Sequence, residues 1–487
     1  MLTCGFCRSP KATNDNDKIP EDVLWEIFGA YRQLYELQPD FDTHWSSIDG
    51  WIKLTHVCLH WRRVVLSSST HLHLRLLFTP RRSSKAPMLK SLPRFPILVD
   101  YGAISWTEEE ETRALAALRH RRRVRGITLR GPCPANLLRA LKHPFPELES
   151  LQISPTSDSE YDRELVLPPM LLSGSAPRLR RLTLRKVAPA SLSPLLSFTT
   201  DLVELTIAVS SGDSSPPIPS LIPNLRRMLS LRRLELRLIY RPDALSSDPP
   251  VPARAGDGVL LPKLTHLIFT GHRSYLQELV VGLATPSLQY LTTTLLGQAR
   301  NAYTISHLCK FIKDAECQFT TVRLTFSRQN FEFYGSRGSD DQHFRITIPE
   351  PFTLDQLGQE LSGSLFTVEE LVIAWDVERW YTEALVQTDQ WRAFYSYLPQ
   401  VKSVQVQGEV AVDIARSLQQ DGLEPALDYL PALRRVEVRS LVGEGDQYET
   451  IRDAFRPLVA ARQMADYPIK FSWSLWSYRD QELWLVR

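Results

Sequence analysis

Residues 231–236 read Leu-Arg-Arg-Leu-Glu-Leu, an apolar pattern with the spacing L-x-x-L-x-L. Ten looser or closer copies occupy the chain between residues 124 and 438, and neighbouring copies begin 23 to 33 residues apart, except for one interval of 49. Their first positions are Val124, Leu148, Leu179, Leu202, Leu264, Leu288, Phe319, Val368, Val401 and Leu433. A unit that returns at this period indicates a solenoid with one strand per repeat. The chain is therefore predicted to form a curved, parallel sheet whose broad face binds another macromolecule.

The residues between the apolar positions test this strand interpretation. Side chains alternate between the two faces of a strand, so the position between the last two apolar residues should be polar. Only Ile268 and Val372 break this rule. The polar members are Thr128, Gln152, Thr183, Thr206, Glu235, Thr292, Arg323, Gln405 and Glu437. The pattern predicts one buried face and one solvated face.

Composition narrows the class of protein. The 57 basic and 55 acidic residues nearly cancel, so charge favours neither nucleic acid nor an anionic membrane as partner, and we expect a protein partner. The sequence has no apolar run of eighteen residues, and residues 1–11 lack the apolar stretch of a secretory signal. The six cysteines are scattered, which suits a reducing compartment. We therefore expect a protein of the cytoplasm or nucleus.

The pattern divides the chain into four parts. Residues 1–16 are predicted to be a disordered tail, 17–78 a small helical domain, 79–96 a linker, and 97–487 the repeat solenoid with a C-terminal cap. Thr107 and Glu110 have the spacing of a capping box at the start of a helix. Residues 331–334 and 344–348 both alternate and flank a Gly/Ser/Asp turn, so we expect an inserted hairpin in the long interval between repeats.

The helical domain holds the second informative motif. Residues 19–28 read Ile-Pro-Glu-Asp-Val-Leu-Trp-Glu-Ile-Phe, with proline and acids where a first helical turn accepts them. Residues 54–65 read Leu-Thr-His-Val-Cys-Leu-His-Trp-Arg-Arg-Val-Val and place apolar side chains at helical spacing. About sixty residues bury little apolar surface alone, so a partner groove is a natural place for the surplus.

This segment resembles an F-box, and is particularly similar to the F-boxes of fungal, basidiomycete-type proteins with degenerate leucine-rich repeats. The resemblance implies an α/β chain, in which a small all-helical F-box precedes an irregular leucine-rich-repeat solenoid. It further implies docking on the Skp-type adaptor of a cullin ubiquitin ligase, while the repeats hold a protein substrate for ubiquitin-dependent degradation. The adaptor-facing candidates, carried over by motif position, are Pro20, Leu24, Ile27, Phe28, Leu54, Val57, Cys58 and Trp61.

Alternatives remain for both parts of this hypothesis. The apolar stripes of residues 19–65 could serve only as the core of a helical bundle. The whole chain could be a repeat-domain interaction scaffold without a role in ubiquitin ligation. The segment between Gly29 and Gly50 is longer than in a compact F-box, which is a departure from the family pattern.

Candidate substrate-binding residues lie on the solvated positions of the middle repeats. They are Arg181, Arg185, Arg233, Glu235 and Arg237, with Trp375 and Trp380 as aromatic anchors nearer the C-terminus. The arginines favour an acidic or phosphorylated peptide, because a guanidinium can bind a carboxylate or phosphate through two hydrogen bonds. A merely solvated strand face explains the same residues.

The sequence offers no pattern for catalysis, a cofactor or a metal. It contains no G-x-x-x-x-G-K, no G-x-S-x-G and no H-E-x-x-H. Cys4 and Cys7 lack a second ligand pair. We therefore expect a non-enzymatic protein.

Overall fold

The computed structural model describes most of the chain. The described residues are 19–36, 51–67, 76–79, 95–102, 107–155, 164–209, 218–239, 258–296, 303–315, 317–327, 330–338, 342–349, 354–375, 386–407, 410–419, 429–441 and 447–476. The predicted tail and almost all of the predicted linker lie outside them. The chain forms two compact units, one of Met1–Asp162 with Leu167–Thr183, the other of Arg163–Val166 with Leu184–Arg487.

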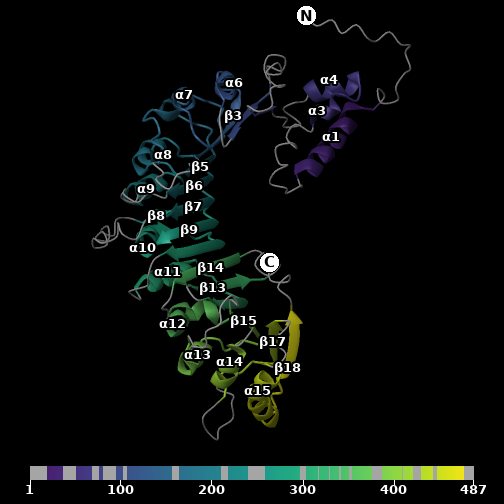
Figure 1. The fold of residues 1–487 in the computed structure, drawn as a ribbon, viewed down its shortest axis with the longest axis vertical. Coiled ribbons are helices and arrows are strands. Elements are labelled where there is room, and N and C mark those ends of the chain that lie inside the picture. Colours follow the sequence, from purple (N-terminus) through teal and green to yellow (C-terminus); the bar gives the residue numbers. More distant parts are fainter. Residues whose placement is uncertain are drawn as a thin grey trace, which may run out of the picture. The chain divides into compact units, whose positions relative to one another are not determined.

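Unit 1 contains the helical segment and the first strands (Figure 1). Its helices are α1 (Glu21–Glu36), α3 (Trp51–Leu54), α4 (Leu59–Ser67), α6 (Glu108–Leu118) and α7 (Ala135–Ala140), with a short 3-10 turn at Leu171–Gly174. Its strands are β1 (Leu76–Phe78), β2 (Ile97–Gly102), β3 (Val124–Arg130) and β4 (Ser150–Ser154), parallel and adjacent in that order. The boundary between the units falls within β5 (Arg181–Arg185).

The structure corrects the predicted end of the helical domain. The predicted helical domain, residues 17–78, includes Leu76–Phe78. In the structure these three residues form a strand that pairs in parallel with Ile97–Val99 of β2. All three residues of β1 are buried, as expected for a strand that is covered on both faces. The sheet of unit 1 therefore starts before the predicted linker.

Unit 2 repeats a strand followed by a helix. Its helices are α8 (Leu192–Leu196), α9 (Ile218–Leu225), α10 (Arg273–Gly282), α11 (Tyr303–Asp314), α12 (Leu354–Leu365), α13 (Thr388–Tyr395), α14 (Val410–Ser417) and α15 (Gln447–Met464), with a 3-10 turn at Pro189–Ser191. Its main strands are β6 (Glu204–Val209), β7 (Arg233–Leu238), β9 (His266–His272), β11 (Tyr290–Leu296), β12 (Thr321–Phe326), β13 (Asn330–Arg337), β14 (Gln342–Pro349), β15 (Glu370–Trp375), β16 (Ser403–Gln407), β17 (Arg435–Leu441) and β18 (Lys470–Trp476). The short strands β8 (Val259–Leu260) and β10 (Leu283–Ala284) pair separately.

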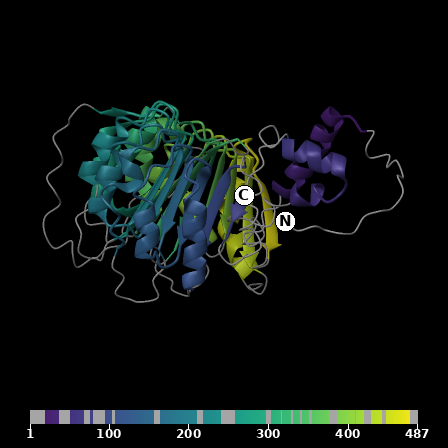
Figure 2. The same ribbon diagram turned by 90° about the horizontal axis from the view of Figure 1, so that it is seen from above.

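The alternation predicted from the sequence matches the burial of most of these strands, with Glu235 on β7 and Gln405 on β16 as buried exceptions. Leu205, Leu234, Leu267 and Leu291 are in register on β6, β7, β9 and β11 and are fully buried. The neighbouring Thr206 and Thr292 are only half-buried. The helices α8 to α14 lie along one side of the sheet (Figures 1 and 2). The other face, named here the open face, carries no helix among the described elements of unit 2.

The helices cover the sheet with one apolar side each. In α12 the buried positions Leu354, Leu357, Leu361 and Leu365 follow the spacing of a single helical face. In unit 1 the predicted capping box at the start of α6 is confirmed. Thr107 Oγ1 accepts a hydrogen bond from the Glu110 N–H, and Glu110 Oε2 accepts one from the Thr107 N–H, both at 3.2 Å.

The predicted hairpin is also confirmed, and it belongs to the sheet itself. The strand order of unit 2 is β6-β7-β9-β11-β14-β13-β12-β15-β16-β17-β18, so β13 and β14 separate β11 from β12. β13 is antiparallel to both neighbours, while the other adjacent strands from β6 to β18 run parallel. Gly335 is needed here because a Cβ at this position would approach the Phe319 ring to 2.7 Å.

Candidate functional site

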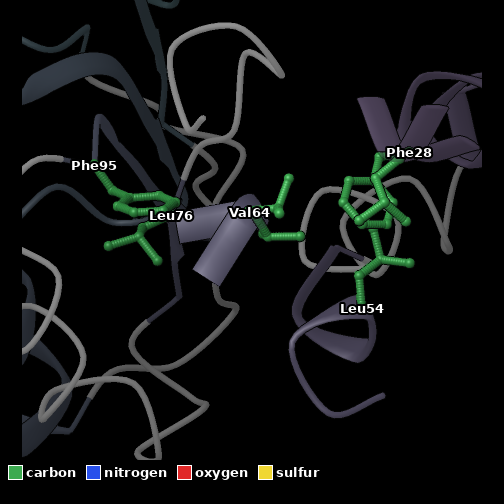
Figure 3. Packing of buried hydrophobic residues seen from close by; sticks show 7 residues of the cluster. Phe28, Leu54, Val64, Leu76 and Phe95 are labelled. Carbon is green, nitrogen blue, oxygen red and sulfur yellow. The ribbon is translucent and has the colours of Figure 1, made fainter. Parts of the chain in front are cut away.

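The helical segment closes a small core of its own in unit 1. Leu24, Phe28 and Leu54 are buried there together with Val64 and Val65, and the same cluster includes Leu76 and Phe95 (Figure 3). Leu24 is fully buried. Three of the eight residues predicted to face an adaptor, Leu24, Phe28 and Leu54, are therefore buried in this core.

Other apolar side chains of the same segment are exposed. Ile27 and Val57, both predicted to face an adaptor, are 39% and 47% exposed. Val23, one helical turn before Ile27, is 44% exposed, and Leu59 at the start of α4 is 74% exposed. Pro20 is exposed as well. The segment thus satisfies its core and still presents large aliphatic side chains to solvent.

Trp61 and Cys58 have structural roles within the segment. The Trp61 ring meets Phe28 edge to face, and the Trp61 backbone N–H donates to Cys58 Sγ at 3.4 Å, so the thiol occupies the capping position of α4. Both residues are half-buried. In the part of the chain that is described, the buried Trp61 Nε1 has no hydrogen-bond partner.

The charged residues of β7 that were predicted to bind substrate form ion pairs with one another. Glu235 is a buried carboxylate on the open face, and its side chain is 8% exposed, against 43% for Arg233 and 48% for Arg237. Arg237 Nε donates to Glu235 Oε1 at 2.8 Å, and Arg233 Nη2 lies 3.8 Å from Glu235 Oε2. Two partly exposed arginines on this strand therefore flank one buried carboxylate.

The remaining predicted residues are distributed along the chain. Arg181 belongs to unit 1 and Arg185 to unit 2, and both are exposed. The backbone of Trp375 ends β15, but its side chain lies outside the described residues, as does all of Trp380. Of the predicted substrate-binding residues whose side chains are described, Arg233, Glu235 and Arg237 are joined by ion pairs.

Sequence reasoning missed a second feature of the open face. His266, Tyr290, His343 and Tyr334, here called the aromatic ladder, lie on the adjacent strands β9, β11, β14 and β13. His266 and Tyr290 occupy the same repeat position, directly before the buried Leu267 and Leu291. Their position in the repeat could therefore have indicated from sequence that the two rings are neighbours. The other two residues lie on the hairpin, whose register was not predicted.

The described residues contain no group of three or more His, Cys, Asp or Glu side chains arranged to hold a metal ion. Among them, no helix combines the length and apolar character needed to cross a bilayer. Cys58, Cys133, Cys309 and Cys317 are free thiols, and burial raises the pKa of Cys133 to about 11. Such a thiol is a poor nucleophile near neutral pH.

Comparison with known proteins adds little. No family model matches the sequence, and no curated protein matches it. A solved structure, the leucine-rich repeat-containing protein LegL7 from Legionella pneumophila, aligns with 68% of this chain and 97% of its own at 11% identity and a TM-score of 0.27. A likeness at that score carries no argument about this chain. The repeat architecture rests on the chain's own alternation of strands and helices.

Proposed function

We propose that this chain is a substrate receptor of a Skp-cullin-F-box ubiquitin ligase, acting in the cytoplasm or nucleus. The helical segment docks on the Skp-type adaptor, and the repeats, of the leucine-rich kind, bind a protein substrate. The protein is not an enzyme in this proposal. It holds a target near the ubiquitin-conjugating enzyme, so that a lysine of the target reacts at high effective concentration.

The observation that carries the proposal is the exposure of Val23, Ile27, Val57 and Leu59 beside a core that is already closed. Large apolar side chains exposed on a small helical unit are typical of a surface that another protein covers. The resemblance of residues 19–28 and 54–65 to an F-box suggests that the covering protein is a Skp-type adaptor. The free described cysteines are consistent with a reducing compartment.

A co-purification experiment tests adaptor docking. The full chain is expressed with a recombinant Skp-type adaptor, and the adaptor recovered with it is measured by mass spectrometry. Ile27→Asp combined with Val57→Asp should remove the adaptor, because a carboxylate placed in an apolar contact loses its hydration. Val281→Asp is the matched control, since Val281 on α10 is 53% exposed in unit 2.

Two results would sink the proposal. Adaptor recovery from the double variant at the wild-type yield would exclude these residues from the contact. Adaptor recovery without cullin-dependent ubiquitination of any co-purified protein in a reconstituted reaction would favour the interaction scaffold instead.

A further inference from the structure

The aromatic ladder crosses the middle of the open face of unit 2. The rings of His266 and Tyr290 are stacked at 4.1 Å between centroids, with an interplanar angle of 14°. Tyr290 meets His343 edge-on at 4.6 Å, and His343 lies over Tyr334 at 6.0 Å. All four side chains are half-buried, so part of each remains accessible to solvent.

Two arginines flank the end of the ladder. The guanidinium carbon of Arg323 on β12 lies 5.9 Å from the centre of the Tyr334 ring, and that of Arg345 on β14 lies 5.8 Å from it. Tyr334 is the Cα partner of both residues, so the three side chains form one row across β14, β13 and β12. Such contacts hold the guanidinium groups in place beside the ring.

The acids near this row are engaged within the sheet. Glu332 Oε1 lies 3.2 Å from Arg345 Nε. Glu370 accepts a hydrogen bond from Gln405 Nε2 at 2.6 Å and one from Thr321 Oγ1 at 3.4 Å. β7, which lies next to β9 at the other end of the ladder, has a similar arrangement, with Arg233 and Arg237 more exposed than Glu235. Arg345, Arg233 and Arg237 are therefore each more exposed than the acid beside them, with Arg345 at 36% and Glu332 at 28%.

The hairpin is what assembles this surface. β9 and β11 supply His266 and Tyr290, whereas His343, Tyr334 and Arg345 come from the two strands inserted between β11 and β12. Other positions on the open face are occupied by small polar residues, such as Thr292 and Thr294 on β11. Large rings are not required there for strand formation, and the charge of their surroundings fits an anionic ligand.

We propose that the aromatic ladder, with Arg323 and Arg345, is the docking surface for an acidic segment of a partner protein that carries an aromatic side chain beside carboxylate or phosphate groups. This inference rests on the proposed role of the repeats as the substrate-binding part. A short acidic segment fits better than nucleic acid, because Glu332 and Glu370 lie beside the row and would repel a line of phosphates that continued past the two arginines.

The test is a fluorescence anisotropy titration of the full chain. The probe is a fluorescein-labelled peptide of glutamates around a central tyrosine, used in its unmodified and tyrosine-phosphorylated forms, with a lysine-for-glutamate peptide as the comparison. Arg323→Gln and Tyr334→Leu should each weaken binding of the acidic peptide by about ten-fold or more. Rising salt should weaken it in the wild-type protein, where no substitution affects folding.

Arg439→Gln on β17 is the matched control, because Arg439 Nε donates to Glu437 Oε1 at 2.8 Å on the same face but outside the ladder. It should leave the affinity unchanged. Tighter binding of the phosphorylated peptide assigns the anion to phosphate, and equal binding assigns it to carboxylate; either supports the proposal.

Three outcomes would overturn it: equal binding of the acidic and basic peptides, no loss in the ladder variants that keep the wild-type melting temperature, or preferential binding of oligouridylate that the same variants remove. Adaptor recovery is measured on the same variants. Because it depends on Ile27 and Val57, its failure would concern the ligase role and leave the peptide result standing.

Discussion

The Phe28 ring on α1 meets the Trp61 indole on α4 edge to face, with 5.0 Å between the ring centroids and an interplanar angle of 68°. This contact joins the two halves of the F-box-like motif. A residue pair that holds two helices together contributes to the stability of the segment. Trp61 therefore contributes to the geometry of the helical segment, while its partly exposed side chain stays a predicted adaptor contact.

The burial of Leu24 gives a first prediction. Leu24→Ala should destabilise the helical segment by about 2 to 5 kcal/mol, because it leaves a cavity in a closed core. Ile27→Ala, on the exposed side of the same helix, should cost less than about 0.5 kcal/mol. Hydrogen exchange of α1 and α4 measures both. Equal loss of protection in the two variants would contradict the assignment of inward and outward faces.

The strand phase of unit 2 gives a second prediction. Leu205→Ala should destabilise unit 2 by about 2 to 5 kcal/mol, whereas Thr206→Ala on the open face should change its stability by under about 0.5 kcal/mol. Urea unfolding followed by circular dichroism compares the variants. A shared shift of the unfolding midpoint would show that the two faces of β6 are wrongly assigned.

The ion pairs of β7 give a third prediction. Arg237→Met should lower the urea midpoint more than Arg185→Met, because it leaves the buried Glu235 carboxylate with the more distant Arg233 alone. We expect a cost of about 1 to 3 kcal/mol for Arg237→Met, against under about 0.5 kcal/mol at the exposed Arg185. Adding Glu235→Met to Arg237→Met should recover part of the loss, and no recovery would mean that the carboxylate is solvated.

Two histidines of β9 predict a dependence of stability on pH. Burial lowers the pKa of both His266 and His272, with Arg233, His343 and Arg273 adding to the shift and Glu204 opposing it at His266. The folded state thus favours neutral imidazole. Its contribution is complete above the unfolded-state pKa of about 6.5, and it is lost as the pH falls through the lower folded-state pKa.

The melting temperature of the wild-type protein should therefore decrease between about pH 7.5 and about pH 5.5. The decrease should be smaller in the double variant His266→Gln, His272→Gln. His143→Gln, at an exposed position in unit 1, serves as the comparison. The same decrease in all three proteins would assign the pH dependence to other groups.

Much of the fold could be predicted because the decisive signals are local. The apolar spacing around Leu205 and Leu234, the Thr107 capping box and the alternation of residues 331–334 each depend on neighbours within one element. The position of β13 and β14 inside the sheet could not be predicted, since it depends on backbone pairing of β14 with Tyr290 and its neighbours on β11, which are distant in sequence.

The candidate sites were less predictable for a related reason. Periodicity places Leu24 and Ile27 on one apolar stripe, yet the structure buries the first and exposes the second. Which edge of a wide stripe faces inward is decided by the helices packed against it, here through Leu54 and Val64. Glu235 follows the polar pattern of its strand but is buried by its own neighbouring arginines, an effect of side-chain geometry that spacing does not encode.

The inserted hairpin also bears on how the sheet folds. Parallel strands are joined by a long crossover connection, and such distant contacts close slowly. Only residues 338–341 separate β13 from β14, and only residues 327–329 separate β12 from β13, so these three strands can associate early. We expect them to nucleate unit 2, with the slower parallel strands adding on either side, so that the row of Arg345, Tyr334 and Arg323 is complete before His266 and Tyr290 join the ladder.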